Sequence, residues 1–471
     1  MSRKIIIGVL ALFIGIYFLV NYTINDTKFK TLKNLLKVED KLLIKKLFFP
    51  HKLINRQLEI ISQLQESLIE KDHKIKKLSY LENINPSIFS ELELIFKKNK
   101  SDVRIKKFKD IKLSNNKILK SYNLIDGFYS GINQTQPGSG YIDFHQNNLL
   151  ALSARGILIF TEDIDNKINF KQIENNINKF IGLKQFKKKW FSLKDLLILN
   201  DKIFISYTEE IKDNCWNTSI IYGNMNYEYI EFEKLFSNNK CVHYSNNIDG
   251  EFNAHQSGGK IINFDNNHIL LSVGDYRSRF LAQEKNSING KIIKIDINNH
   301  DFEIISMGHR NPQGLYFDKE NNFILETEHG PMGGDEINLI EVDKINKDAQ
   351  LNYGWPMASA GEHYGGIQKN IKKYKKYPLY KSHSEYNFIE PLISFVPSIG
   401  ISEITKIEKN KYVVSSLRAK SLYFFELDNE KKIINLESVK LFERIRDLIF
   451  KNNKLYLFLE STASIGVISL N

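Results

Sequence analysis

The stretch NNFILETEHG at residues 321–330 contains the pattern that decides the fold. An Asn-rich turn precedes a run of apolar residues, and the run ends in small or polar residues. Asn and Asp tolerate positive φ and open hairpins, whereas β-branched and aromatic residues favour strands. The same pattern recurs as NNLLALSARGILIF at 147–160, NDKIFISYTEE at 200–210, NNHILLSVGDY at 266–276, KNKYVVSSLRAKSLYFF at 409–425 and NNKLYLFLESTASIGVISL at 452–470.

Six copies of this element predict six similar antiparallel sheets. Their uneven spacing suits blades that carry loop insertions of different length. A radial array of such sheets is a β-propeller. We therefore expect an all-β fold, a six-bladed β-propeller over residues 100–471. A β-sandwich with long loops is the alternative, but one sandwich accommodates six matching copies poorly.

The N-terminal residues predict a membrane anchor. The run IIIGVLALFIGIYFLVN at 5–21 is almost wholly apolar, and with the next three residues it reaches the ~20 residues that a helix needs to cross a bilayer. It lacks a small-residue cleavage site. The prediction is an uncleaved transmembrane signal anchor over 1–27, single-pass in the inner (cytoplasmic) membrane, with the propeller in the periplasm. Four lysines between 28 and 37 oppose this orientation, and a buried core helix is the alternative.

Residues 28–99 are predicted to form a helical stalk. Apolar residues after Pro50 recur at three- and four-residue steps, which is typical of a helix with one apolar face. A short coiled coil here would make the protein a homo-oligomer. The alternative is a single amphipathic stalk that packs on the propeller. The apolar positions are Ile61, Leu64, Leu68, Ile75 and Leu78.

Composition excludes some partners. The 471 residues are 42% hydrophobic, which is enough for a large core. The net charge of +11 comes from 66 basic against 55 acidic residues and is spread widely. Without an Arg-rich strip interleaved with aromatics, we expect no nucleic-acid binding; the basic N-terminal region suits a membrane surface instead. The two cysteines, Cys215 and Cys241, could form a disulfide in an exported chain or remain free.

Polar residues follow or precede the apolar strands at corresponding places. In a propeller these places border a central cavity, so the polar side chains should converge there. The excess of arginine indicates an anionic ligand, because guanidinium groups pair bidentately with carboxylates. The converging set is His255, Asp275, Arg310, Asn311, the EHGP turn at 328–331, Arg418, Arg444 and Arg446.

Over about residues 110–470 the chain resembles the soluble pyrroloquinoline quinone (PQQ)-dependent sugar dehydrogenases, the glucose/sorbosone dehydrogenase family of six-bladed propellers. Several motifs in the same order carry the resemblance. The strongest are HQSGGKIINF at 255–264, GHRNPQGLYF at 308–317, EHGPMGGDEINLI at 328–340 and NYGWP at 352–356. Weaker ones are VPSI at 396–399, SSLRAKSL at 415–422 and RIRD at 444–447.

The resemblance implies two catalytic residues. His255 matches the family histidine that removes the proton from the C1 hydroxyl of the sugar, a task that suits imidazole because its free pKa lies near neutrality. A hydride then passes from C1 to the quinone. Arg310 matches the family arginine that stabilises the charge developing on the quinone oxygen.

The resemblance also implies two cofactors, PQQ and calcium. Gly330 and Pro331 match the turn whose main-chain carbonyls hold calcium, for which oxygen is the preferred ligand. PQQ carries three carboxylates and so takes several cationic or polar partners. The implied PQQ contacts are Asn311, Arg418, Arg444 and Arg446.

The expected function is therefore that of a membrane-anchored, PQQ- and calcium-dependent dehydrogenase that oxidises an aldose sugar at C1 to its lactone. Its electrons would pass to an acceptor that the sequence does not identify. The segment KKWFSLKDLLIL at 188–199 lacks the Gln-Gly-Gly-like motif of the family. One alternative is hence a non-catalytic propeller that has lost PQQ and binds a carbohydrate or protein partner. Another is a lactonase-like propeller, which would need a carboxylate-rich metal site on its axis.

Overall fold

The computed structural model of the protein describes residues 102–124, 128, 139–164, 168–180, 190–345 and 350–470, all within one compact unit, 83–471. The predicted anchor at 1–27 and the predicted stalk at 28–99 both lie outside the described residues. Among the residues described, no helix combines the length and apolarity needed to cross a membrane.

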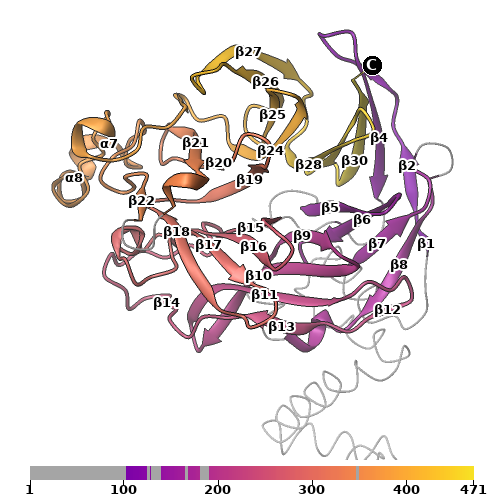
Figure 1. Ribbon diagram of the computed structural model, residues 1–471, viewed down its shortest axis with the longest axis horizontal. Helices are drawn as coiled ribbons and strands as arrows, with labels where there is room; N and C mark the ends of the chain where they lie inside the picture. The colour runs from indigo at the N-terminus through magenta and orange to yellow at the C-terminus, as the bar shows by residue number, and fades with distance from the viewer. Residues whose placement is uncertain are drawn as a thin grey trace, which may run out of the picture. The chain divides into compact units, whose positions relative to one another are not determined.

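The described residues form six sheets, each with four main strands in antiparallel order, which confirms the predicted all-β propeller (Figure 1). The first three blades consist of β5 (Gly140–His145), β6 (Asn148–Ser153), β7 (Leu158–Thr161) and β8 (Phe170–Asn175); β9 (Leu193–Leu199), β10 (Lys202–Lys212), β11 (Cys215–Asn224) and β13 (Glu233–Phe236); and β15 (Gly258–Asn263), β16 (His268–Val273), β17 (Lys291–Asp296) and β18 (Phe302–Met307).

The other three blades consist of β19 (Pro312–Asp318), β20 (Phe323–Glu328), β21 (Asp335–Glu341) and β23 (Ile393–Phe395); β24 (Ile401–Glu408), β25 (Lys411–Ser416), β26 (Ser421–Leu427) and β27 (Ile433–Lys440); and β28 (Ile445–Lys451), β29 (Lys454–Leu459), β30 (Ser464–Ser469) and β4 (Ile118–Leu124). Shorter strands extend four of these sheets: β1 (Asp102–Val103), β2 (Ile105–Lys107), β3 (Ile111–Lys112), β12 (Tyr229–Ile230), β14 (Val242–His243) and β22 (Leu351–Asn352).

Each of the six recurring sequence elements contains the second strand of a blade. These strands are β6, β10, β16, β20, β25 and β29. In the turns before β10, β20 and β29, Asn or Asp residues adopt the positive φ that they tolerate better than most residues. Asn200 and Asp201 lie at φ 49° and 57°, and Asn452 and Asn453 at 49° and 58°. The local signal thus marks the same hairpin in all six blades.

The propeller is closed by strands from both ends of the described chain. The innermost strands β5, β9, β15, β19, β24 and β28 contact one another in a ring, with β28 beside β5. In the sixth blade, β4 pairs antiparallel with β30, from Ser464 opposite Asn123 to Ile468 opposite Leu119. This pairing ties the last blade to the chain segment that leads into the first blade.

Among the described residues, six apolar layers, one between each pair of neighbouring blades, form the main core. Strand β6 shows how one blade contributes to two layers. Leu150 and Leu152 face the second blade, whereas Leu149 and Ala151 face the sixth. Successive side chains of a strand point to opposite faces, so a blade buried on both faces needs a continuous apolar run. This explains why polar and apolar residues do not alternate within the strand of each recurring element.

Two insertions depart from the repeat. The segment between β21 and β23 carries α7 (Gly366–Lys369), α8 (Ile371–Lys376), η3 (Val342–Lys344) and η4 (Ser384–Tyr386), and η2 (Arg279–Gln283) lies between β16 and β17.

Cys215, at the start of β11, forms a disulfide with Cys241, which precedes β14. The structure thus settles the pairing that the sequence left open.

Candidate functional site

The predicted site residues gather at one end of the blades. The first strand of a blade begins where its second strand ends, because the two are antiparallel. Pro312 in β19 lies opposite Glu328 in β20, and Ile445 in β28 lies opposite Leu459 in β29. Residues that precede a first strand and residues that follow a second strand therefore share this end.

Arg310 is fixed on several sides. Its Nη1 donates to the carbonyl oxygen of His329 at 2.7 Å, and its backbone N–H donates to Glu328 Oε2 at 2.5 Å. The guanidinium carbon lies 5.3 Å from the centre of the Trp355 ring. A guanidinium over an indole face is held by the ring quadrupole. Arg310 is buried and cannot swing freely into solvent.

Asp275 connects three of the sequence motifs. Its Oδ2 accepts a hydrogen bond from Trp355 Nε1 at 2.9 Å, and its backbone N–H donates to the Arg310 carbonyl at 2.9 Å. The amide of Gln256 satisfies its neighbours when its nitrogen faces Asp275 and its oxygen faces Arg310. In this orientation Gln256 donates to Asp275 Oδ1 and accepts from Arg310 Nη2 at 3.0 Å. Burial raises the pKa of Asp275, and Arg310 opposes the rise. HQSG, GHRNP and NYGWP are thus parts of one network.

Asn311 continues the network toward the sixth blade. Its Oδ1 accepts hydrogen bonds from the Gly258 N–H and from Gln313 Nε2, both at 3.1 Å. The Oε1 of Gln313 accepts from Arg446 Nη1 at 3.3 Å. Gln313 therefore bridges two predicted cofactor residues. Sequence reasoning missed it, although it lies within the quoted motif GHRNPQGLYF.

Arg444 and Arg446 share one carboxylate. Arg444 Nε donates to Glu460 Oε2 and Arg446 Nη2 donates to Glu460 Oε1, each at 2.9 Å. Although burial opposes ionisation, Arg446 and then Arg444 lower the pKa of Glu460. Glu460 directly follows the apolar strand of the sixth repeat but was not among the predicted site residues.

Lys194 is a further buried cation of this region. Burial, together with the positive charges of Arg446 and Arg155, lowers its pKa to about 7, and Glu460 opposes the shift. It lies on β9, within the segment 188–199 that departs from the family motif. The departure therefore brings a lysine to the arginine cluster.

His255 lies just before β15 and is partly exposed. Its backbone N–H donates to Asn253 Oδ1 at 2.9 Å, and its ring lies 5.2 Å from the ring of Trp190. Trp190 also packs edge-on against Phe252, which contacts Tyr244. An aromatic wall thus borders the candidate base.

Arg418 stands apart from the other predicted residues. It follows β25, and its side chain is exposed. Its backbone N–H donates to the Ile399 carbonyl at 3.0 Å. Its guanidinium forms no hydrogen bond or ion pair with the other predicted site residues in the described ranges. The structure therefore does not bring Arg418 into the network that joins Arg310, Asn311 and Arg446.

The Gly330–Pro331 turn is braced by Asp335. Asp335 Oδ1 accepts from the Gly330 N–H at 3.1 Å, and Oδ2 accepts from the Gly400 N–H at 2.6 Å. A Cβ atom at residue 330 would lie 2.0 Å from the Gly334 carbonyl oxygen, so only glycine fits. Among the described residues, no N–H or O–H donates to the carbonyl oxygens of Gly330 or Pro331.

A charged cluster lies between the innermost strands. Lys260 Nζ contacts Glu403, Asp195 and Asp447 at 2.7, 3.3 and 3.7 Å. Although burial opposes its charge, these carboxylates hold the pKa of Lys260 well above its ordinary value. The lactonase-like alternative needs a carboxylate-rich metal site here. The carboxylates are present, but the lysine ammonium lies among them.

Comparison with known proteins identifies the family to which this chain belongs. A model of the family described as glucose/sorbosone dehydrogenase matches residues 198–467. The match covers more than half of the chain, and the chain belongs to this family.

Individual relatives agree with the family. The chain is 27% identical to the aldose sugar dehydrogenase of Escherichia coli (strain K12) over 183 residues, which is 36% of this chain and 45% of the relative. The matched part spans about half the length of the curated relatives.

Solved structures show the same fold. The apo form of the soluble aldose sugar dehydrogenase from E. coli superposes with a TM-score of 0.55 at 19% identity, covering 75% of this chain and 100% of that one. The PQQ-bound form of aldose sugar dehydrogenase from Streptomyces coelicolor gives a TM-score of 0.52 at 16% identity, covering 79% and 98%.

Proposed function

We propose that this propeller is a PQQ- and calcium-dependent dehydrogenase that oxidises an aldose at C1 to the lactone. The observation that carries the proposal is the continuous network from Gln256 through Arg310 and Asn311 to Arg446, which unites motifs from three different blades. Membership of the glucose/sorbosone dehydrogenase family supports it.

The residues present fit an anionic cofactor. Arg444 and Arg446 share the single carboxylate of Glu460, so one positive charge of the arginine pair remains uncompensated. At pH values below its pKa, Lys194 adds a second positive charge. These three residues and Asn311 would hold PQQ through its carboxylates and ring oxygens. The exposed Arg418 remains a predicted contact that would have to reach the cofactor from the rim. When bound, PQQ supplies a quinone carbonyl that accepts the hydride from the sugar.

The Gly330–Pro331 turn fits calcium. Both carbonyl oxygens are left without a hydrogen-bond donor among the described residues, and Asp335 holds the turn in place. Free carbonyl oxygens on a rigid turn are suitable ligands for a hard cation. They would hold calcium, whose charge would polarise the quinone beside it.

His255 would act as the general base. A neutral imidazole can take the proton of the C1 hydroxyl near neutral pH. Its partial exposure leaves the ring accessible to a substrate. Arg310, held by the His329 carbonyl and the Trp355 ring, would present fixed positive charge where negative charge develops.

The aromatic wall beside His255 supports a sugar substrate. Trp190, Phe252 and Tyr244 form a connected set of rings, and the Tyr244 side chain is 52% exposed. The apolar C–H face of a pyranose packs well on such rings, while its hydroxyls remain available to polar groups. We therefore assign this wall to the sugar and the arginine cluster to the cofactor.

For location, we propose the inner membrane, with the propeller in the periplasm. The apolar run at 5–21 and the disulfide between Cys215 and Cys241 support export to an oxidising compartment. Electrons would leave through an acceptor in that compartment, and the stalk would supply any oligomeric contact.

The test is aldose-dependent dye reduction by the purified full-length protein in the presence of PQQ and calcium. We expect activity that requires both cofactors and falls by roughly 10²–10⁴-fold in His255→Asn. His268→Asn is the matched control, because His268 pairs with Asp265 away from the network. Absence of activity with every aldose tried, despite bound PQQ, would contradict the proposed reaction.

A further inference from the structure

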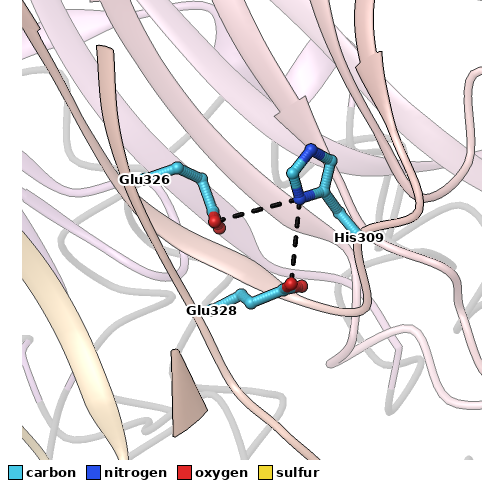
Figure 2. A group of neighbouring side chains, drawn as sticks. All are labelled: His309, Glu326 and Glu328. Atoms are coloured by element: carbon cyan, nitrogen blue, oxygen red, sulfur yellow. Dashed lines mark ion pairs between the residues drawn. The ribbon is translucent and has the colours of Figure 1, made fainter. Parts of the chain in front are cut away.

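A second polar cluster lies buried behind Arg310, and the proposed reaction does not use it. It consists of His309, Glu326 and Glu328 (Figure 2). His309 Nδ1 lies 3.8 Å from Glu326 Oε2 and 3.8 Å from Glu328 Oε1. The histidine and Glu326 are fully buried, and Glu328 is 3% exposed.

The fold aims these three side chains at one point. Glu326 and Glu328 alternate on β20 and therefore project from the same face of the strand. His309, in the connection from β18 to β19, packs against Tyr353 with ring centres 4.9 Å apart. Its Nε2 is engaged by the Ser306 hydroxyl at 2.8 Å. The ring is thereby held with Nδ1 toward the two carboxylates.

Asn338 Nδ2 donates to Glu326 Oε2 at 2.9 Å and to Glu328 Oε1 at 3.4 Å, but other polar atoms of the cluster lack a partner. His309 Nδ1, Glu326 Oε1 and Asn338 Oδ1 are buried and have no hydrogen-bond partner among the described residues. Most buried polar atoms in folded proteins are satisfied, so three such atoms in one cluster require an explanation.

Apart from His309 itself, the cluster has no basic side chain such as lysine or arginine among the described residues. A third buried carboxylate, that of Glu336, lies directly across from Glu328 on β21. No lysine or arginine in the described ranges forms an ion pair with these three glutamates. The cluster at Lys260 differs, because there a lysine provides the missing charge.

We propose that His309 Nδ1, Glu326 and Glu328 bind a divalent first-row transition ion such as zinc. Imidazole nitrogen with carboxylate oxygen is a donor set that suits zinc, whereas calcium prefers oxygen ligands alone. Two donors that each lie ~2.1 Å from zinc at a tetrahedral angle are about 3.4 Å apart. Both histidine–carboxylate separations are 3.8 Å, and all three donor atoms lie within 4.8 Å of one another, so side-chain rotation would have to bring them closer around the ion.

The ion would have a structural role. Its ligands join the connection before β19 to strand β20, and Glu328 also accepts the Arg310 backbone N–H. The ion would therefore hold in place the loop that carries Arg310 and Asn311. The oxygens of the Gly330–Pro331 turn are a different donor set, so zinc and calcium are distinguishable by their ligands.

The test measures zinc bound by the full-length, untagged protein, refolded with zinc under non-reducing conditions and passed through gel filtration. We expect one zinc per chain in the wild type and about one fewer in Glu326→Gln. Glu403→Gln is the matched control, because it removes a buried carboxylate from the cluster that already contains Lys260; it should retain the zinc. Equal zinc in wild type and Glu326→Gln, or none in either, would overturn the proposal.

A second measurement avoids dependence on the folding of a variant. X-ray absorption spectroscopy of the zinc-loaded wild type should show one imidazole among oxygen ligands and no sulfur. Zinc should also raise the midpoint of thermal unfolding, because an ion that binds only the folded state stabilises it. A spectrum with oxygen ligands alone would identify zinc adsorbed elsewhere and would contradict the assignment.

Discussion

The indole of Trp355 packs against the guanidinium of Arg310 and also donates a hydrogen bond to Asp275. Its ring lies 5.3 Å from the Arg310 guanidinium carbon, and its N–H donates to Asp275 at 2.9 Å. Asp275 in turn donates its backbone N–H to the Arg310 carbonyl. One residue of the NYGWP motif thus positions the charge that the proposed reaction requires, without itself touching the substrate.

Trp355→Phe tests this support. The variant keeps an aromatic ring but removes the hydrogen bond to the buried Asp275 carboxyl, so we expect a loss of about 1–3 kcal/mol in the free energy of unfolding. PQQ-dependent turnover should fall further than the stability loss explains, because Arg310 loses its orientation. Urea unfolding and dye reduction below the unfolding transition measure the two effects. Turnover equal to that of the wild type would show that Arg310 does not depend on Trp355.

Lys194 predicts a pH dependence of cofactor binding. Its pKa of about 7 lies below its unfolded value, so the ammonium is charged below pH 7 and neutral above it. The affinity for an anionic cofactor should therefore fall as pH rises through 7, by at most about tenfold per pH unit. Lys194→Met should bind more weakly at low pH and lose most of this dependence. PQQ titrations across this range would contradict the role of Lys194 if both proteins gave the same pH profile.

Lys260→Met should destabilise the propeller strongly. The substitution leaves Asp195, Glu403 and Asp447 buried without their cation, which typically costs about 3–5 kcal/mol. Burial raises the pKa of Asp195 to about 7 and that of Glu403 to about 8, and Lys260 opposes both shifts. A carboxyl group whose pKa is higher in the folded than in the unfolded state favours folding only while it is protonated. The free energy of unfolding should therefore fall further as the pH rises through 7 and 8.

Chemical denaturation of Lys260→Met at several pH values measures this effect. Lys411→Met is the control, because Lys411 forms a surface pair with Glu408 and should change stability by about 0–1 kcal/mol. Similar losses in the two variants would show that Lys260 does not neutralise the cluster.

Removal of the disulfide should weaken the second blade. Cys215 and Cys241 are separated by 26 residues, and a loop of this size predicts a stabilisation of about 3.5 kcal/mol. The double substitution of both cysteines by alanine should lower the unfolding midpoint by a corresponding amount. Dithiothreitol should lower the midpoint of the wild type but not that of the double variant. An unchanged midpoint in reduced wild-type protein would contradict a stabilising role.

The blades were predictable because their signal is local. An Asn or Asp turn followed by an apolar run specifies a hairpin wherever it occurs, and each of the six copies became the second strand of a blade. The strand that closes the ring was not predictable in this way. Strand β4 belongs to no repeat, and its place is decided by pairing with β30 at the other end of the described chain.

The site was predictable only where motifs mark it. Arg310, Asn311 and Arg446 lie in one network, as the motifs indicate, whereas Arg418 remains exposed at the rim. Gln313 contacts Arg446 across 133 residues of sequence. Such contacts form between inner strands that are far apart in the sequence, so no local sequence pattern predicts them. Glu460 and Lys194 were missed for the same reason.

The most direct test of the proposed function is a calorimetric titration of the full-length protein with PQQ in the presence of calcium. We predict one PQQ bound per chain at micromolar or lower concentration. Binding should weaken when Arg446 is replaced by Met and when calcium is chelated. Failure of the folded wild type to bind PQQ at micromolar concentrations, with calcium present, would contradict the assignment of this propeller as a quinone-dependent dehydrogenase.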